Sequence, residues 1–317
     1  MLKTTLRASV ATASLLAATG AFADVTVYTA GPAGLIEQLA AGFTEETGIA
    51  IDFFQATTGN IMARIEAEAA NPAVDVLISA SWDTATDFAE RGWLAPYTSP
   101  NAATVPDFLQ TETAVAQGVA ALAIAWNPTS GTPRPTEWAD LTAPEFEGLV
   151  NLPDPALSGS AFELVSALMG TSGMDLFEGL AANGAEVAGA NAAALNPVLQ
   201  GAKAAVFGAV DYIALNNMAA GESIEVIFPE SGTVIAPRPM MILNWSDNQE
   251  DAQAFIDYVL SDAGQAIVAA QNLMPARSDV AADRPLIADL TILPIDAETV
   301  YGQRSETLDA FAGAFAQ

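Results

Sequence analysis

From residue 25 onward, hydrophobic residues alternate between strand-like runs and helix-like spacing. VTVYTA is rich in β-branched residues, GLIEQLAAGFTEETG has apolar residues at helical spacing up to Gly48, and IAIDFFQA is strand-like again. The order then repeats: TTGNIMARIEAEAANPA predicts a helix that stops at Asn71-Pro72, and VDVLISA predicts a buried strand. Alternating strands and helices predict an α/β fold with parallel strands and crossover helices.

The rest of the chain predicts a second lobe. AVAQGVAALAIAWNP is a long apolar strand that could carry the chain into it, and ESIEVIFPESGTVIAPRPMMILN could bring the chain back. A chain of 317 residues is too long for one small core and suits two lobes. We therefore predict that residues 24–125 and 236–317 form a discontinuous lobe 1 and that residues 126–235 form lobe 2.

The first 23 residues have the three-part pattern of an export signal. Lys3 and Arg7 precede an apolar run of about a dozen residues, and Ala21-Phe22-Ala23 is a small-x-small cleavage site. The run is shorter than the roughly 20 residues of a membrane-spanning helix. We expect residues 1–23 to be a signal peptide and the remainder to be a periplasmic protein of a Gram-negative bacterium.

Composition excludes several classes of function. The formal charge is −28, or about −30 without the signal peptide, and no basic cluster is present, which disfavours nucleic acid as a partner. The chain has neither cysteine nor histidine, so thiolate or histidine metal sites, cysteine nucleophiles and Ser-His-Asp triads are excluded. We expect no cofactor and no catalysis; the alternative, a secreted hydrolase, lacks a G-x-S-x-G or S-x-x-K motif between a strand and a helix.

The candidate ligand site lies in loops at the carboxyl ends of strands, where open α/β sheets bind ligands. The loop residues concerned are Thr29, Gly31, Thr57, Thr58, Gly59, Asn60, Ser158, Gly159, Ser160 and Ala161. Hydroxyl groups and unpaired amides at a helix start bind anions. Ordinary N-capping by serine or threonine is the alternative for each loop.

Further candidates follow two other strands. Ser79, Ser81 and Trp82 come after the strand VDVLISA, where Trp82 could flank a ligand or pack in the core. Asp211 and Tyr212 follow the apolar run AVFGAV. A carboxylate and a phenol there could meet a cationic group or a metal, or could belong to an ordinary turn.

Two charged residues near the return crossing have equally open roles. Glu230, in FPESGT, could bind a cationic group or be a solvated turn residue. Arg238 lies between Pro237 and Pro239 in a chain with few basic residues. It could bind an anion, but the excess of carboxylates favours an ion pair that holds the hinge.

The segments quoted above, together with LAIAWNP, VIFPESGTV and NLMPARSDV, resemble the periplasmic solute-binding proteins of ABC importers. The resemblance covers nearly the whole chain after the signal peptide. More narrowly, the chain resembles the branch of this family that contains ferric-iron-, 2-aminoethylphosphonate- and sugar-phosphate-binding receptors. It implies a type II fold, in which two lobes, each a mostly parallel sheet flanked by helices, close on a ligand around two crossing hinge strands. It also implies a monomer that delivers its solute to a membrane permease powered by an ATPase; a receptor for chemotaxis would share the same site.

The resemblance also narrows the ligand. Ferric receptors usually have two adjacent tyrosines where this chain has Asp211 and Tyr212, so an iron site would have to use Tyr212, Asp211 and Glu230. Phosphonate and sugar-phosphate relatives hold the anion with serine, threonine and amides at helix starts, which fits TTGN and SGSA. Asp211 would then be the counter-charge for an ammonium group, which makes 2-aminoethylphosphonate the predicted ligand.

Overall fold

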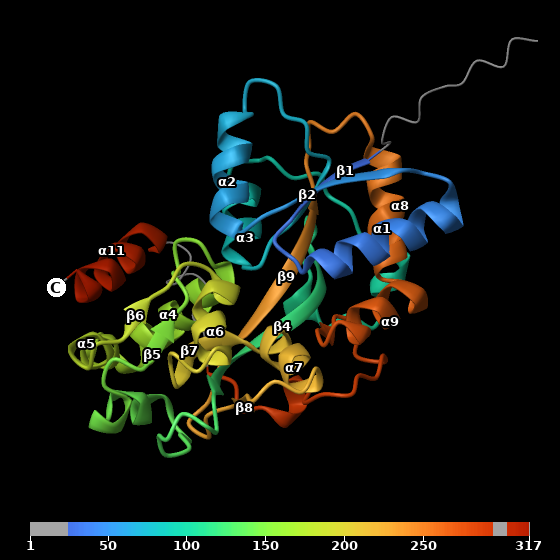
Figure 1. Ribbon diagram of the computed structural model, residues 1–317. Coiled ribbons are helices and arrows are strands. Elements are labelled where there is room, and N and C mark those ends of the chain that lie inside the picture. The colour runs from blue at the N-terminus through green and yellow to red at the C-terminus, as the bar shows by residue number, and fades with distance from the viewer. Residues whose placement is uncertain (1–24, 294–302, 317) are drawn as a thin grey trace, which may run out of the picture.

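The computed structural model describes residues 25–293 and 303–316, so the predicted signal peptide lies outside the described residues. The core is one 10-stranded sheet with the order β2-β1-β3-β9-β4-β7-β5-β6, to which β8 and β10 are added by pairing with β4. β4 (Val115–Trp126) and β9 (Ile235–Ile242) pair antiparallel with each other. These two strands run from one lobe into the other (Figure 1), as expected of the hinge.

Lobe 1 contains the two predicted strand–loop–helix units. β1 (Val25–Thr29) lies between β2 (Ile51–Gln55) and β3 (Val76–Ile78) and is parallel to both. The helices of lobe 1 are α1 (Ala33–Thr47), α2 (Thr58–Ala67), α3 (Asp83–Glu90), α8 (Gln249–Val259) and α9 (Asp262–Ala270). Helix α2 ends before the predicted stop at Asn71-Pro72, because the chain turns there and the Asn71 amide donates to the Glu68 carbonyl at 2.8 Å.

Lobe 2 continues the same sheet beyond β4. Its strands are β5 (Val150–Leu152), β6 (Glu186–Val187), β7 (Ala205–Val210) and β8 (Glu225–Ile227). β5 is parallel to β6 and β7, whereas β7 and β8 are antiparallel to β4. The helices are α4 (Gly159–Ser172), α5 (Asp175–Ala182), α6 (Asn191–Leu199) and α7 (Asp211–Ala219). In the described ranges no helix has the length and apolar character needed to cross a membrane.

The β9 crossing contains Pro237 and Pro239. Proline has no amide hydrogen and is accepted in sheets mainly where the ladder is irregular. The β4–β9 register shifts between Ala116 and Val119, which lie opposite these prolines. The ladder between the two crossing strands is therefore interrupted here, and Arg238 lies between the prolines with only 1% of its surface exposed.

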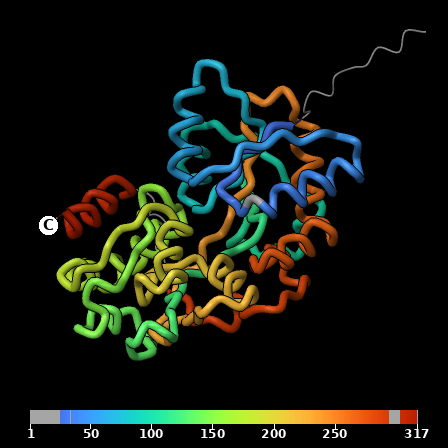
Figure 2. The backbone as a smooth tube through the Cα atoms, in the orientation of Figure 1, coloured from blue at the N-terminus to red at the C-terminus, as the bar shows by residue number. Residues whose placement is uncertain are grey.

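The C-terminal part of the chain departs from the predicted division into lobes. β10 (Met274–Pro275) pairs with β4 in lobe 1, but Ile292 then forms a bridge with Thr233 beyond the hinge. α11 (Arg304–Phe315) packs against α4 and α5 of lobe 2, where the rings of Phe311 and Phe177 are 5.6 Å apart. We call the chain after β10 the third crossing between the lobes. Figure 2 shows α11, in red, at the side of lobe 2. The prediction that all of residues 236–317 belong to lobe 1 is therefore wrong for their last part, because α11 buries its apolar face on lobe 2.

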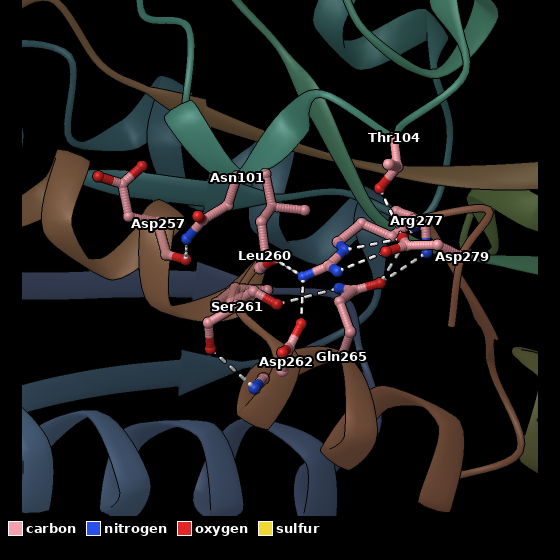
Figure 3. Close-up of polar contacts among 12 residues, drawn as sticks. Asn101, Thr104, Asp257, Leu260, Ser261, Asp262, Gln265, Arg277 and Asp279 are labelled. Carbon is pink, nitrogen blue, oxygen red and sulfur yellow. Dashed lines mark hydrogen bonds and ion pairs between the residues drawn. The ribbon is translucent and has the colours of Figure 1, made fainter. Parts of the chain in front are cut away.

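Arg277 anchors the start of this third crossing to lobe 1 (Figure 3). Its guanidinium group donates to the Leu260 carbonyl at 3.1 Å and pairs with Asp279 at 2.7 Å and Asp262 at 2.8 Å. Thr104 donates a further hydrogen bond to Asp279 at 2.6 Å. The hydrogen bonds with Asp279 raise the pKa of Arg277 and lower that of Asp279, so both groups are charged at neutral pH.

Candidate ligand-binding site

A cavity of about 320 Å³ lies between the lobes, where the loops after β1 and β2 face lobe 2. Lobe 1 contributes Ala30, Gly31, Pro32, Gln55, Ala56, Thr57, Thr58 and Ala80 to its lining, and lobe 2 contributes Leu157, Ser158, Gly159, Ala190, Asn191, Ala192, Tyr212 and Ile213. The predicted ligand residues that the structure brings together here are Gly31, Thr57, Thr58, Ser158, Gly159 and Tyr212. The volume suits a small solute.

Four helices begin at the lining of this cavity: α1 and α2 from lobe 1, and α4 and α6 from lobe 2. The amides in the first turn of a helix have no acceptor in their own helix, and the helix dipole adds partial positive charge there. The cavity is therefore a positive region in a protein whose formal charge is −28. Such a convergence of N-termini favours an anion.

Several of the predicted hydroxyl groups cap amides, as the alternative for each loop allowed. Their oxygens accept hydrogen bonds as follows: Thr29 from Gly31 at 3.0 Å, Thr57 from Asn60 at 3.4 Å, and Ser158 from Ala161 at 3.2 Å. The Ser158 hydroxyl also donates to Asn191 at 2.9 Å. These hydrogen bonds fix the starts of α2 and α4 and the loop before α1.

Thr58 is different, because its hydroxyl group has no partner among the described residues although it is buried. Thr58 lines the cavity from the first turn of α2. Side-chain atoms of Gln117, Asn151 and Ser166 also lack a partner in the described ranges, but none of these residues lines the cavity. Since a buried hydroxyl normally forms a hydrogen bond, Thr58 is a donor available to a solute.

Arg238 does not line the cavity but contacts two residues that do. It donates to the Ala30 carbonyl at 3.1 Å and to the Tyr212 hydroxyl at 3.4 Å, and its Nε atom has no partner within the described part of the chain. No carboxylate among the described residues pairs with it. The predicted ion pair at the hinge is therefore not found among the described residues. A buried cation without a counter-charge is costly.

Asp211 does not face the cavity. Its carboxylate forms an ion pair with Arg284, both side chains being fully buried, and it accepts the amides of Ala121 at 2.9 Å and Tyr212 at 2.7 Å. Burial raises the pKa of the Asp211 carboxyl, while Arg284 and the two amides act in the opposite direction. Arg284 belongs to the third crossing, so Asp211 fastens that segment to α7 and is not available as the counter-charge for an ammonium group.

The residues predicted for an iron site do not come together either. Glu230 is exposed in the turn after β8 and does not line the cavity. Tyr212 lines it, but burial raises the pKa of its phenol, and Arg238 contacts its oxygen. Within residues 25–293 and 303–316, no group of three or more aspartate, glutamate, histidine or cysteine side chains could hold a metal ion.

Three predicted ligand residues lie behind the cavity at the start of α3. The Ser79 hydroxyl shares a hydrogen bond with that of Thr84 at 2.8 Å. The Ser81 hydroxyl and the Trp82 amide donate to one carboxylate oxygen of Glu163, from lobe 2, at 2.6 and 2.9 Å. Ser81 and Trp82 therefore contact the other lobe, Ser79 is bonded within lobe 1, and none of the three lines the cavity.

Two further contacts close the lobes around the cavity. The Gly59 amide of α2 approaches the Leu157 carbonyl of lobe 2 at 3.4 Å, and the Ser160 hydroxyl of α4 donates to the Ala80 carbonyl of lobe 1 at 3.3 Å. A second cavity of about 850 Å³ adjoins at Thr58 and lies between α2, α3 and α11. The structure thus describes the closed arrangement of the two lobes.

Gln55 and Asn191 line the cavity, although neither was among the predicted ligand residues. Arg238 was expected to pair with a carboxylate. The Gln55 side chain donates to the Gly31 carbonyl at 2.9 Å and supports the first loop. Asn191 begins α6 after a loop of three residues that follows β6 and contains Gly189. Its alanine-rich surroundings hid this strand–loop–helix pattern.

Comparison with known proteins agrees with this architecture. An uncharacterized protein from Haemophilus influenzae is 26% identical over 262 residues, covering 76% of this chain and 74% of that protein. The periplasmic binding protein AfuA from Actinobacillus pleuropneumoniae, with fructose-6-phosphate bound, has a TM-score of 0.84 at 21% identity, covering 92% of this chain and 98% of that chain. Iron-bound HitA from Pseudomonas aeruginosa has a TM-score of 0.81 at 22% identity, covering 92% of this chain and 98% of that chain. These structural likenesses confirm the predicted two-lobed α/β fold. Residues 71–301, most of the chain, match one family, and the protein therefore belongs to the bacterial extracellular solute-binding proteins.

Proposed function

We propose that this protein is the periplasmic receptor of an ABC importer and captures a small phosphonate or phosphate anion by closure of its lobes. One observation carries the proposal: Arg238 is buried against two lining residues of the cavity without a carboxylate partner among the described residues. A solute anion would supply the counter-charge, and the four helix starts and the Thr58 hydroxyl would complete its hydrogen bonds. The monomeric closed form would then deliver the solute to a permease and its ATPase.

The ammonium group of 2-aminoethylphosphonate finds little to bind in this site. No aspartate or glutamate is among the lining residues of the cavity, and Asp211 is neutralised by Arg284. We therefore keep 2-aminoethylphosphonate as the first compound to test, but expect ethylphosphonate, which lacks the amine, to bind with similar affinity.

A sugar phosphate is the second candidate. The adjoining cavity of about 850 Å³ shares Thr58 with the anion site and gives room for a larger solute if the lobes open slightly. AfuA, which shares the fold, is a sugar-phosphate complex. Ferric iron is disfavoured, because the guanidinium group of Arg238 contacts the hydroxyl of Tyr212, the one tyrosine predicted as an iron ligand.

Thermal stabilisation by a panel of solutes tests the proposal. A ligand that binds only the folded state at a hundred times its Kd stabilises that state by about 2.7 kcal/mol, which raises the melting temperature by several degrees. We expect this shift with ethylphosphonate, 2-aminoethylphosphonate or fructose-6-phosphate, and none with ferric citrate. The absence of a shift with every phosphorus compound would refute the ligand class.

A further inference from the structure

Helix α3 of lobe 1 begins at a contact with lobe 2 that lies outside the ligand cavity. Its N-cap residue, Trp82, has no side chain that caps the helix. The cap comes from Glu163 of α4, whose carboxylate accepts the Trp82 amide at 2.9 Å and the Ser81 hydroxyl at 2.6 Å. None of these three residues lines the cavity. A helix of one lobe is therefore capped by a carboxylate of the other.

The C-terminal helix adds a second bond at the same place. Asp83, the first residue of α3, forms an ion pair with Arg304 of α11, and both residues line the adjoining cavity of about 850 Å³. The Arg304 guanidinium also lies 4.2 Å from the centre of the Phe162 ring in lobe 2. Three consecutive residues of lobe 1, Ser81 to Asp83, are thus held by lobe 2 or by the helix packed on it. We name Ser81, Trp82, Asp83, Glu163 and Arg304 the α3 latch.

The α3 latch and the ligand cavity share one rigid element. Glu163 lies one turn after Gly159, at which α4 begins and which lines the cavity. Opening of the lobes would separate Glu163 from both of its α3 donors and would separate α4 from the lobe 1 half of the anion site. Any bond that favours the closed lobes also raises the apparent affinity for a ligand that binds only that form.

We propose that Glu163 is a positioning residue that sets the open–closed equilibrium through the α3 latch, without touching the solute. The latch keeps a closed population in the ligand-free protein and so raises ligand affinity. Its effect on affinity rests on the proposed function, whereas its effect on the shape of the ligand-free protein does not.

Small-angle X-ray scattering of ligand-free variants tests the latch. Ser81→Ala removes the hydroxyl that donates to Glu163, and Glu163→Gln removes the charge that strengthens both bonds. We expect either variant to increase the radius of gyration and to weaken ligand binding by about three- to tenfold. The matched control, Glu178→Gln, changes an exposed glutamate of lobe 2 and should alter neither quantity. Circular dichroism and melting curves establish that each variant is folded.

The outcomes separate the two proposals. If Ser81 bound the solute directly, Ser81→Ala would lower affinity but leave the ligand-free radius of gyration unchanged, which would overturn the latch. Unchanged scattering for both variants would also overturn it, even if phosphonates bind. If scattering changes as expected but no phosphorus compound binds, the latch stands and the proposed ligand class falls. A further support is a less-than-additive effect in the double variant, since both changes act on the same bond.

Discussion

The ligand cavity and the α3 latch both join the lobes, but they differ in how their polar groups are satisfied. At the cavity, the Thr58 hydroxyl and the Arg238 Nε atom are buried without a partner among the described residues. At the latch, one carboxylate oxygen of Glu163 accepts from both Ser81 and Trp82. Buried polar groups are normally paired. We propose that a solute completes the Thr58 and Arg238 groups, whereas the protein itself completes the hydrogen bonds of the latch.

The largest effect should come from removing the buried charge at the cavity. Arg238→Met is expected to lower affinity for the anion at least a hundredfold, about 3 kcal/mol, because our proposal makes this buried guanidinium group the counter-charge of the solute. The ligand-free protein should melt at the same temperature or higher, since an unpaired buried charge is replaced by an apolar side chain. Calorimetric titration and melting curves measure the two quantities.

Arg134→Met is the control for Arg238→Met, because Arg134 is an exposed residue of lobe 2 that pairs with Glu225 at 2.7 Å. It should bind the anion like the wild type. If Arg238→Met bound the anion with wild-type affinity, the unpaired groups at the cavity would not be completed by a solute, and the proposed difference between the cavity and the latch would be contradicted.

A steric wedge should weaken both regions together. A Cβ atom at Gly59 would lie 2.4 Å from the Ala156 carbonyl oxygen of lobe 2, so Gly59→Ala must hold the lobes apart. We expect a larger radius of gyration. We also expect roughly tenfold weaker ligand binding, because a smaller fraction of the protein would be in the closed form that binds the ligand. Gly170→Ala in α4 is the control, since a Cβ atom there meets nothing within 4 Å. An unchanged scattering curve for Gly59→Ala would show that the lobes do not close as described.

Neighbouring threonines should give opposite results at a smaller scale. Thr58→Val removes a hydroxyl with no partner among the described residues and should lower affinity about tenfold without loss of stability, as expected for a hydrogen bond to a charged ligand. Thr57→Val removes the cap of α2 and should instead lower the free energy of unfolding by about 1 kcal/mol. Chemical denaturation and titration of both variants compare the two effects, and a stability loss in Thr58→Val would contradict its assignment to the solute.

The smallest effect concerns the ionisation of Tyr212. Burial raises the pKa of its phenol above the usual value, although Arg238 lowers it in part. A raised folded-state pKa means that the contribution to stability is complete below the unfolded pKa of about 10 and is lost as the pH rises through the folded value. The stability difference between wild type and Tyr212→Phe should therefore be constant from pH 6 to 9 and should fall above pH 10. A change between pH 6 and 9 would indicate a phenolate, the form suited to ferric iron.

The local units of the fold could be predicted from the sequence because their signals are local. The periodicity of residues 25–80 located β1, α1, β2, α2 and β3, and the polar loops TTGN and SGSA reached the cavity because loops at the carboxyl ends of strands meet at one edge of the sheet. The long apolar run before Asn127 became β4, buried over its whole length.

The pairing of charged groups could not be predicted, because it depends on residues far apart in the chain. Asp211 and Arg284 are 73 positions apart and meet only through the third crossing. Arg238 was expected to find one of many carboxylates, but the prolines on either side place it in the buried hinge beside Tyr212. The role of Ser81 likewise depends on Glu163, 82 positions away in the other lobe. A local pattern that predicts a loop does not predict which lobe completes its hydrogen bonds.

Calorimetric titration with a matched set of anionic and neutral compounds tests the central claim most directly. The set contains 2-aminoethylphosphonate, ethylphosphonate and the uncharged diethyl ester of ethylphosphonate. Our account predicts that the two anions bind with similar affinity and that the neutral ester does not bind, because Arg238 and the helix starts require negative charge. Binding of the neutral ester as tightly as the anions, or binding of ferric citrate alone, would contradict it.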